Sequence, residues 1–193
     1  LIGGLLKSGV NVNDVGLVPT PLLYYSCFKL RSKGGVMVTG SHNPKDHNGF
    51  KFVLDKSPFF GEDLKKIQKA ALKYKNSLKS GVLKKTNLNC DYVQRLLKKI
   101  YFPKKLNIVW DSGNGAAGEI MKKISKKVPG VHTLLFDNID GDFPNHHPDP
   151  SIPENLDFCK KKILEDNLDF GIAFDGDGDR IGVVDDKGRI IQG

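Results

Sequence analysis

Three aspartates that alternate with glycines, Asp175, Asp177 and Asp179, have the most evident capacity for chemistry in this sequence. They follow an apolar run, 168–174, which predicts a short buried strand. Because carboxylates so close together repel one another, a folded chain tolerates them only with solvent or a cation between them. Oxygen-only ligands suit a hard ion such as Mg²⁺ or Ca²⁺ and argue against zinc or copper. The run therefore predicts a divalent-cation site.

An ordinary acidic turn and an EF-hand loop are the alternatives to such a site. Two glycines, Gly176 and Gly178, make the run more ordered than most acidic turns, because they let the backbone fold tightly enough for the carboxylates to converge. An EF-hand loop beginning at Asp175 needs glycine at its sixth position and glutamate at its twelfth. This chain has Arg180 and Asp186 there, which excludes the EF-hand.

A second stretch combines a serine, a histidine and a lysine. The apolar residues 36–39 predict a strand that runs into a turn carrying Ser41 and His42, and Pro44 holds the chain extended there. His42 could act as a base or a hydrogen-bond donor, and Lys51 adds positive charge nearby. By itself the pair is weak evidence, because a loop serine is more often a turn hydroxyl and the Gly-x-Ser-x-Gly elbow is missing.

Together the two stretches resemble the α-D-phosphohexomutases, and most closely the bacterial phosphomannomutase/phosphoglucomutase enzymes. The active-site signature of that family, Thr-(Ala or Gly)-Ser-His-Asn-Pro, stands at 39–44, and its metal-loop signature, Asp-Gly-Asp-Gly-Asp-Arg, stands at 175–180. Further matches lie at 16–21, 111–115 and 140–150. Because the matches follow one another in the order of the family, chance does not account for them.

The resemblance implies a role for the serine and for the aspartates. Ser41 would be the phosphoserine that gives its phosphoryl group to the sugar and takes one back. Asp175, Asp177 and Asp179, with an oxygen of phosphorylated Ser41, would bind Mg²⁺. Phosphoryl transfer spreads negative charge over oxygens in the transition state, so positioned cations supply most of the catalysis.

The resemblance also implies a reaction and its remaining residues. Arg180 would contact anionic groups at the site, while His42 and Lys51 are candidates for proton transfer and charge stabilisation. The substrate would be a phosphorylated hexose, interconverted between its 1-phosphate and 6-phosphate through a bisphosphorylated sugar that reorients in the cleft. The alternative is a non-catalytic module that binds metal and phosphate.

The resemblance predicts an α/β fold of two consecutive domains, with mixed, mostly parallel sheets flanked by helices. Residues 1–90 would be the family's first domain, truncated at its N-terminus, and residues 91–193 its second. The family's third and fourth domains, which carry the loops that grip the sugar and its phosphate, have no counterpart in this sequence. We therefore expect little or no turnover from these residues by themselves.

Hydrophobic periodicity and turn residues predict alternating strands and helices, an order typical of α/β folds. Strands joined through helices imply right-handed crossovers and parallel pairing. The expected elements are a helix at 21–30, strands at 36–39 and 50–54, a lysine-rich helix at 62–75, a polar connection at 76–89, a helix capped by Asp91, a strand at 106–110, a helix at 116–128, a strand at 131–136, a helix near 154–165 and strands at 168–174 and 181–184.

The net charge of +8, from 30 Lys and Arg against 22 Asp and Glu, suits nucleic acid, a membrane surface or small phosphorylated ligands. Lysines between residues 62 and 75 alternate with apolar residues at helical spacing, which is typical of a solvated helix face. No aromatic residues interleave with basic ones to form a base-stacking platform. Nucleic-acid binding is therefore an alternative that no motif supports.

Three widely spaced cysteines, Cys27, Cys90 and Cys159, form neither a C-x-x-C pair nor a zinc spacing. They are typical of reduced thiols in a cytoplasmic protein. No segment approaches the length of a transmembrane helix, and the first residues lack the pattern of a secretory signal. We expect a cytoplasmic protein without a membrane partner. The sequence specifies neither its oligomeric state nor the preferred hexose.

Two further motifs admit other interpretations. The segment 113–118 satisfies G-x-G-x-x-G, and Asp137 follows at the end of the next predicted strand, as in a dinucleotide-binding fingerprint. The resemblance accounts for this segment as the first turn of the second domain, which binds no nicotinamide in the family. His146 and His147 could suggest zinc, but adjacent residues rarely converge on one ion, and the prolines around them favour an extended loop at the domain interface.

Overall fold

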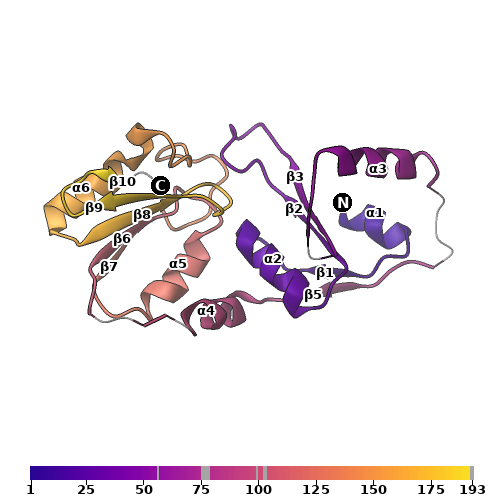
Figure 1. The fold of residues 1–193 in the computed structure, drawn as a ribbon, viewed down its shortest axis with the longest axis horizontal. Helices are drawn as coiled ribbons and strands as arrows, with labels where there is room; N and C mark the ends of the chain where they lie inside the picture. Colours follow the sequence, from indigo (N-terminus) through magenta and orange to yellow (C-terminus); the bar gives the residue numbers. More distant parts are fainter. Residues whose placement is uncertain (56, 75–78, 99, 102–103, 192–193) are drawn as a thin grey trace.

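The computed structural model describes residues 1–55, 57–74, 79–98, 100–101 and 104–191. They form two lobes that lie side by side (Figure 1). The indigo-to-magenta lobe contains the first five strands, and the pink-to-yellow lobe contains the last five. Helix α4 (Asn89–Leu97) lies between the lobes along one side (Figure 1).

The first lobe contains two small sheets rather than one. Strands β2, β3 and β4 form an antiparallel sheet, and β1 pairs with β5 in parallel. Both sheets line a cavity of about 1470 Å³ with mostly apolar walls. The elements of this lobe are α1 (Ile2–Lys7), β1 (Val12–Asp14), α2 (Thr20–Lys29), β2 (Gly34–Val38), β3 (Phe50–Leu54), β4 (Ser57–Phe59), α3 (Glu62–Ala71) and β5 (Leu83–Lys85).

The second lobe is a five-stranded sheet in the order β10-β9-β8-β6-β7, covered by helices on both faces. Successive residues of β6 point to opposite faces, as in any strand. Trp110 packs with Met121 of α5, and Val109 packs with Ile163 of α6. Its elements are β6 (Ile108–Asp111), α5 (Gly118–Ser125), β7 (His132–Leu135), the 3₁₀ helix η1 (Pro153–Leu156), α6 (Asp157–Asp166), β8 (Phe170–Phe174), β9 (Ile181–Asp185) and β10 (Ile190–Ile191).

The predicted α/β architecture with mixed sheets is confirmed, whereas the balance of strand directions differs. Among the described strands, three pairings are parallel and four are antiparallel. The two loops at 39–49 and 175–180 each join strands that are neighbours in a sheet, β2 to β3 and β8 to β9. A loop of this kind can only connect antiparallel neighbours, whereas a parallel pair needs a crossover.

Two local predictions need correction or lie outside the described residues. Asp91 does not cap its helix, because α4 begins at Asn89 with Leu88 as the N-cap. Its carboxylate instead accepts hydrogen bonds from Tyr25 (2.5 Å) and Lys29 (3.0 Å) of α2. The lysine-rich helix ends at Ala71, and both residue 75 of the predicted helix and residues 76–78 of the predicted connection lie outside the described part of the chain.

One hydrophobic cluster spans both lobes. It brings together Leu22 of α2, Val93 of α4 and Ile120 of α5, and the first two are fully buried. The two lobes therefore share part of their core, with α4 as the intermediary. The division into residues 1–90 and 91–193 stays a prediction. No helix among the described residues has the length and apolar character to cross a bilayer.

We expect Leu22→Ala to lower the free energy of unfolding by about 2–5 kcal/mol, because it removes a buried side chain and leaves a cavity in the shared cluster. Leu17→Ala is the matched control, since Leu17 is 70% exposed and should change stability by less than about 0.5 kcal/mol. Urea denaturation followed by tryptophan fluorescence measures both. Equal effects of the two substitutions would contradict the packing described here.

Candidate active site

The serine loop continues directly from β2. The amide of Thr39 donates to the carbonyl of Gly49 at 3.0 Å, which extends the β2–β3 ladder to the base of the loop. The amide of Ser41 then donates to Thr39 Oγ1 at 2.8 Å. Ser41 adopts a left-handed backbone conformation, with φ of 55°. Such a conformation is unfavourable for serine, so the contacts around the loop must maintain it.

The acidic loop folds around one carboxylate. Asp175 is fully buried, and its Oδ1 accepts hydrogen bonds from the backbone amides of Asp179 and Arg180, both at 3.0 Å. Asp177 is also buried, at 3% exposure, while Asp179 is exposed. Because the backbone amides occupy Oδ1, the second oxygen of Asp175 is left to face the serine loop.

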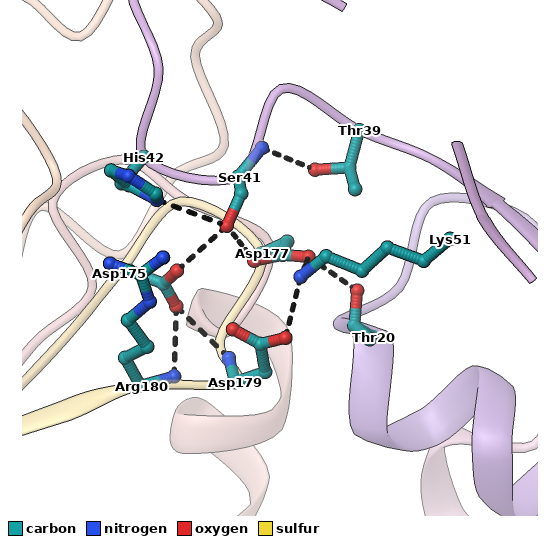
Figure 2. Close-up of polar contacts among 9 residues, drawn as sticks. All are labelled: Thr20, Thr39, Ser41, His42, Lys51, Asp175, Asp177, Asp179 and Arg180. Atoms are coloured by element: carbon teal, nitrogen blue, oxygen red, sulfur yellow. Dashed lines mark hydrogen bonds and ion pairs between the residues drawn. The ribbon is translucent and has the colours of Figure 1, made fainter. Parts of the chain in front are cut away.

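The serine loop and the acidic loop meet at the hydroxyl of Ser41. Its Oγ lies 3.1 Å from Asp175 Oδ2 and 3.0 Å from Asp177 Oδ1 (Figure 2). A hydroxyl carries one hydrogen and can donate fully to only one of these carboxylates. One oxygen from each of Asp175, Asp177 and Asp179 lies within 4.8 Å of the others. These oxygens face one another as the ligands of a hard cation do.

Gly176 allows the two loops to approach this closely. A Cβ atom at this position would lie 2.3 Å from the carbonyl oxygen of Ser41, a distance that no side chain tolerates. Behind it, the amide of Ala116 donates to the carbonyl of Gly176 at 2.9 Å. The first turn of the second lobe therefore supports the acidic loop from the side opposite the serine.

Lys51 and Thr20 hold the outer side of the acidic loop. Lys51 Nζ lies 2.6 Å from Asp177 Oδ2 and 2.5 Å from Asp179 Oδ2. Thr20, at the first residue of α2, donates from Oγ1 to Asp177 Oδ2 at 2.5 Å and from its amide to the Asp177 carbonyl at 2.8 Å. Thr20 was not among the predicted site residues. Its segment, 16–21, resembles the family, but only the three-dimensional structure shows that Thr20 contacts Asp177.

His42 and Arg180 lie at the edge of this cluster. His42 Nδ1 is 3.4 Å from Ser41 Oγ, longer than a strong hydrogen bond. Arg180 contributes its backbone amide to Asp175, and its side chain extends past Asp175 towards His42 (Figure 2). All seven predicted site residues thus lie in one place, although Arg180 reaches the aspartates through its backbone.

The charges of the cluster are unevenly balanced. Burial raises the pKa of Asp175, and the nearby charges of Asp177 and Asp179 raise it further. Burial acts the same way on Asp177, but hydrogen bonds from Lys51 and Thr20 outweigh it and lower the pKa of Asp177. Burial also opposes the charge of Lys51, yet the two carboxylates leave its pKa above the ordinary value. Lys51 is therefore a cation at neutral pH.

The two histidines of the proline-rich loop at 140–150 contact different partners. His146 Nε2 lies 3.1 Å from Asp111 Oδ2, and its Nδ1 lies 3.0 Å from the backbone carbonyl of His147. His147 Nε2 instead lies 2.6 Å from the carbonyl of His42. The side chains do not converge, which disfavours zinc, and His147 joins this loop to the serine loop. Among the described residues, the grouping with metal-ligand geometry is the three aspartates.

The glycine-rich turn at 113–118 is used for close packing. A Cβ atom on Gly118 would lie 2.1 Å from the carbonyl oxygen of Asp137. Asn114 donates to the carbonyl of Asn138 at 2.9 Å and accepts from Asn145 at 2.8 Å. These contacts favour a structural role for the turn and its glycines over dinucleotide binding.

Residues 90–188 match alpha/beta/alpha domain II of the phosphoglucomutase/phosphomannomutase family, and residues 1–78 match alpha/beta/alpha domain I. The chain belongs to this family. The phosphomannomutase/phosphoglucomutase of Pseudomonas putida is 44% identical over 191 residues, which are 99% of this chain and 41% of that protein. The phosphoglucomutase of Neisseria meningitidis serogroup B is 39% identical over 190 residues, with 97% of this chain and 41% of that protein covered.

A solved structure of the family has the same fold. The crystal structure of a phosphoglucomutase/phosphomannomutase family protein from Burkholderia thailandensis superimposes with a TM-score of 0.90 at 40% identity. The match covers 97% of this chain and 43% of that one. The chain therefore spans about two fifths of the length of the curated relatives that it matches.

Gly176→Ala should separate the two loops, because the added Cβ would strike the Ser41 carbonyl. We expect the free energy of unfolding to fall by about 1–3 kcal/mol, as for other overpacking substitutions, and amide hydrogen exchange at residues 39–43 to become faster. Gly141→Ala is the control, because a Cβ atom added there would meet no other atom within 4 Å. Unchanged exchange in Gly176→Ala would contradict the close approach of the loops.

The stability contribution of His146 should depend on pH. Burial lowers the pKa of His146, but Asp111 outweighs burial and raises it above its ordinary value of 6.5. A histidine whose pKa is raised in the folded state contributes its full stabilisation at pH values below its ordinary pKa of 6.5. This stabilisation disappears as the pH rises through the pKa of the folded state. The difference in unfolding free energy between the wild type and His146→Gln should therefore shrink between pH 6 and pH 8, as measured by denaturation. A difference that grows with pH would contradict this assignment.

Proposed function

We propose that this chain carries the phosphoryl-donating serine and the cation site of a phosphohexomutase. The reaction would interconvert the 1-phosphate and 6-phosphate of glucose or mannose through phosphorylated Ser41 and a bisphosphorylated sugar. The observation that carries the proposal is the placement of Ser41 Oγ within 3.1 Å of two buried aspartates. The names of the relatives, phosphomannomutase and phosphoglucomutase, support the same reaction class.

The donor set fits Mg²⁺. Asp175, Asp177 and Asp179 offer only oxygens, which are the ligands that this ion prefers. Burial, and then the charges of Asp177 and Asp179, raise the pKa of Asp175, so a bound cation would stabilise its ionised form. When bound, the ion would supply positive charge that offsets the charge of the phosphoserine oxygens during transfer. A phosphate oxygen on Ser41 would complete the ligands offered by the three aspartates.

Ser41 and His42 would perform the covalent step. As the bond between phosphorus and Ser41 Oγ breaks, a bond forms between phosphorus and a hydroxyl oxygen of the sugar, which releases its proton to water. His42 Nδ1, 3.4 Å from Oγ, is placed to give the serine oxygen a proton. The return transfer reverses each change, and His42 then takes the proton from Ser41.

Lys51 and Arg180 would stabilise charge rather than move protons. Lys51 is held as a cation by two carboxylates, so it is a poor base at neutral pH. Its ammonium group is directed at the acidic loop, where the transferring phosphoryl group would lie. The exposed guanidinium of Arg180 extends from the same loop and is free to contact phosphate oxygens in a bidentate manner.

The cellular setting is proposed on the same grounds. A phosphorylated hexose is the expected partner, and the basic balance of the chain suits such an anionic ligand. Reduced cysteines favour the cytoplasm; Cys27 and Cys159 are buried free thiols, and Cys90 is an exposed one. We propose no nucleic-acid or membrane partner. A cation- and phosphate-binding module without transfer activity is the competing function.

Mass spectrometry of the peptide containing Ser41 tests this proposal. After incubation with glucose 1,6-bisphosphate and Mg²⁺, we expect a gain of about 80 Da, one phosphoryl group, on Ser41. Asp177→Asn should abolish the gain, because it removes charge from a carboxylate that faces Oγ. Asp186→Asn, which alters an exposed aspartate outside the site, should leave the gain unchanged.

Each result separates the competing functions. A gain in mass that is unaffected by Asp177→Asn would show that the phosphorylation of Ser41 does not depend on the acidic loop. No gain on Ser41 under any condition, together with retained Mg²⁺ binding by calorimetry, would contradict the mutase proposal and favour the binding module.

A further inference from the structure

We propose that His147 is a positioning residue for the serine loop. Its Nε2 lies 2.6 Å from the backbone carbonyl oxygen of His42, the residue that follows Ser41. A carbonyl only accepts, so Nε2 carries the hydrogen and donates it. The two residues are 105 positions apart and belong to different lobes. This deepens the proposed function and rests on it.

His147 is itself held on both sides. Its backbone carbonyl is 3.0 Å from His146 Nδ1, whose ring is anchored by the buried Asp111. Both ring nitrogens of His146 face acceptors, so each carries a hydrogen in this arrangement. On the other side, the carbonyl of Pro148 accepts the amide of Gly176 at 3.2 Å. The donor is therefore fixed to the end of β6 and to the acidic loop.

Aromatic packing restricts the His146 ring further. It stacks on Phe158, with ring centroids 6.0 Å apart, and forms a T-shaped pair with Phe136, with ring centroids 5.4 Å apart. A ring fixed by two hydrogen bonds and two aromatic neighbours has little freedom to turn. The backbone at His147 is correspondingly constrained, which lets its side chain act as a rigid donor.

The second lobe thus contacts two consecutive carbonyls of the serine loop. The Ser41 carbonyl lies against Gly176, and the His42 carbonyl accepts from His147. Both contacts follow the Cα atom of Ser41, which has a left-handed conformation that serine does not favour. Fixing the peptide on its C-terminal side orients Ser41 Oγ towards Asp175 and Asp177. His147 touches neither Oγ nor the carboxylates, so its effect passes through the backbone.

Two substitutions at this position separate a lost hydrogen bond from a lost ring. His147→Leu removes the donor, whereas His147→Gln retains an N–H at a similar distance from the backbone. His47→Leu is the control, because this histidine lies in the same loop as Ser41 with an exposed side chain. Thermal unfolding establishes that each variant folds before it is compared with the wild type.

The first readout is amide hydrogen exchange at residues 40–43 in the 193-residue chain. We expect about tenfold faster exchange in His147→Leu, near wild-type exchange in His147→Gln and no change in His47→Leu. The second readout is the rate of Ser41 phosphorylation by glucose 1,6-bisphosphate with Mg²⁺. The maximal rate should fall about tenfold or more in His147→Leu, with little change in the half-saturating concentration of the bisphosphate. A misplaced Ser41 Oγ slows the phosphoryl-transfer step but does not weaken the binding of the bisphosphate.

The outcomes distinguish this inference from the function on which it rests. Wild-type exchange and wild-type loading in His147→Leu would overturn the positioning role. Equal loss in the Leu and Gln variants would also overturn it, because the ring and not its hydrogen bond would then matter. If the wild type fails to load while His147→Leu still exchanges faster, the positioning contact is supported and the mutase proposal is contradicted.

Discussion

Mutual repulsion among three carboxylates is the constraint on which this site depends. Two of the three carboxylates are buried, and one oxygen from each of the three lies within 4.8 Å of the others. The neighbouring groups therefore have to stabilise their negative charge. Backbone amides converge on Asp175, while Lys51 and Thr20 contact Asp177. The Ser41 hydroxyl faces the remaining oxygen of each of these two carboxylates, Asp175 Oδ2 and Asp177 Oδ1. This arrangement places the serine oxygen beside three carboxylates whose oxygens suit a divalent cation.

The site exists only because the two lobes are docked. Ser41 and Lys51 come from the β2–β3 connection and from β3, whereas the aspartates come from the connection between β8 and β9. A cluster of buried side chains on α2, α4 and α5 holds the lobes together at some distance from the chemistry. The glycine-rich turn at 113–118 and the proline-rich loop at 140–150 then set the spacing of the two loops near the serine. Backbone contacts therefore add to the side-chain contacts of Ser41, Lys51 and Thr20 with the aspartates in joining the two lobes at the site.

Short sequence patterns predict much of the site, whereas the remaining features depend on contacts between segments that are far apart in the chain. The aspartate–glycine alternation, the Ser41 turn and the strands around them follow from nearest-neighbour chemistry, and so they could be recognised directly. Thr20 could not, because nothing in its own segment indicates a bond to Asp177, 157 residues away. The prediction that Asp91 caps its helix is wrong because its competing partners, Tyr25 and Lys29 of α2, lie more than 60 positions earlier in the chain. The sequence predicts that Gly176 helps the acidic run to fold tightly, but it does not predict the close approach of the Ser41 carbonyl, which comes from a segment 135 positions earlier.

We propose that phosphorylated Ser41 and the three aspartates share one cation, and ³¹P NMR with Mn²⁺ tests this most directly. The chain would be prepared with phosphoserine at position 41, and Mn²⁺ would be titrated as a paramagnetic substitute for Mg²⁺. We expect the phosphoserine signal to broaden at about one equivalent of Mn²⁺ and Asp177→Asn to require far more, because the ion would be held by both the phosphate and the carboxylates. Equal broadening of the wild type and Asp177→Asn would contradict it, since the ion would then bind the phosphate without the acidic loop.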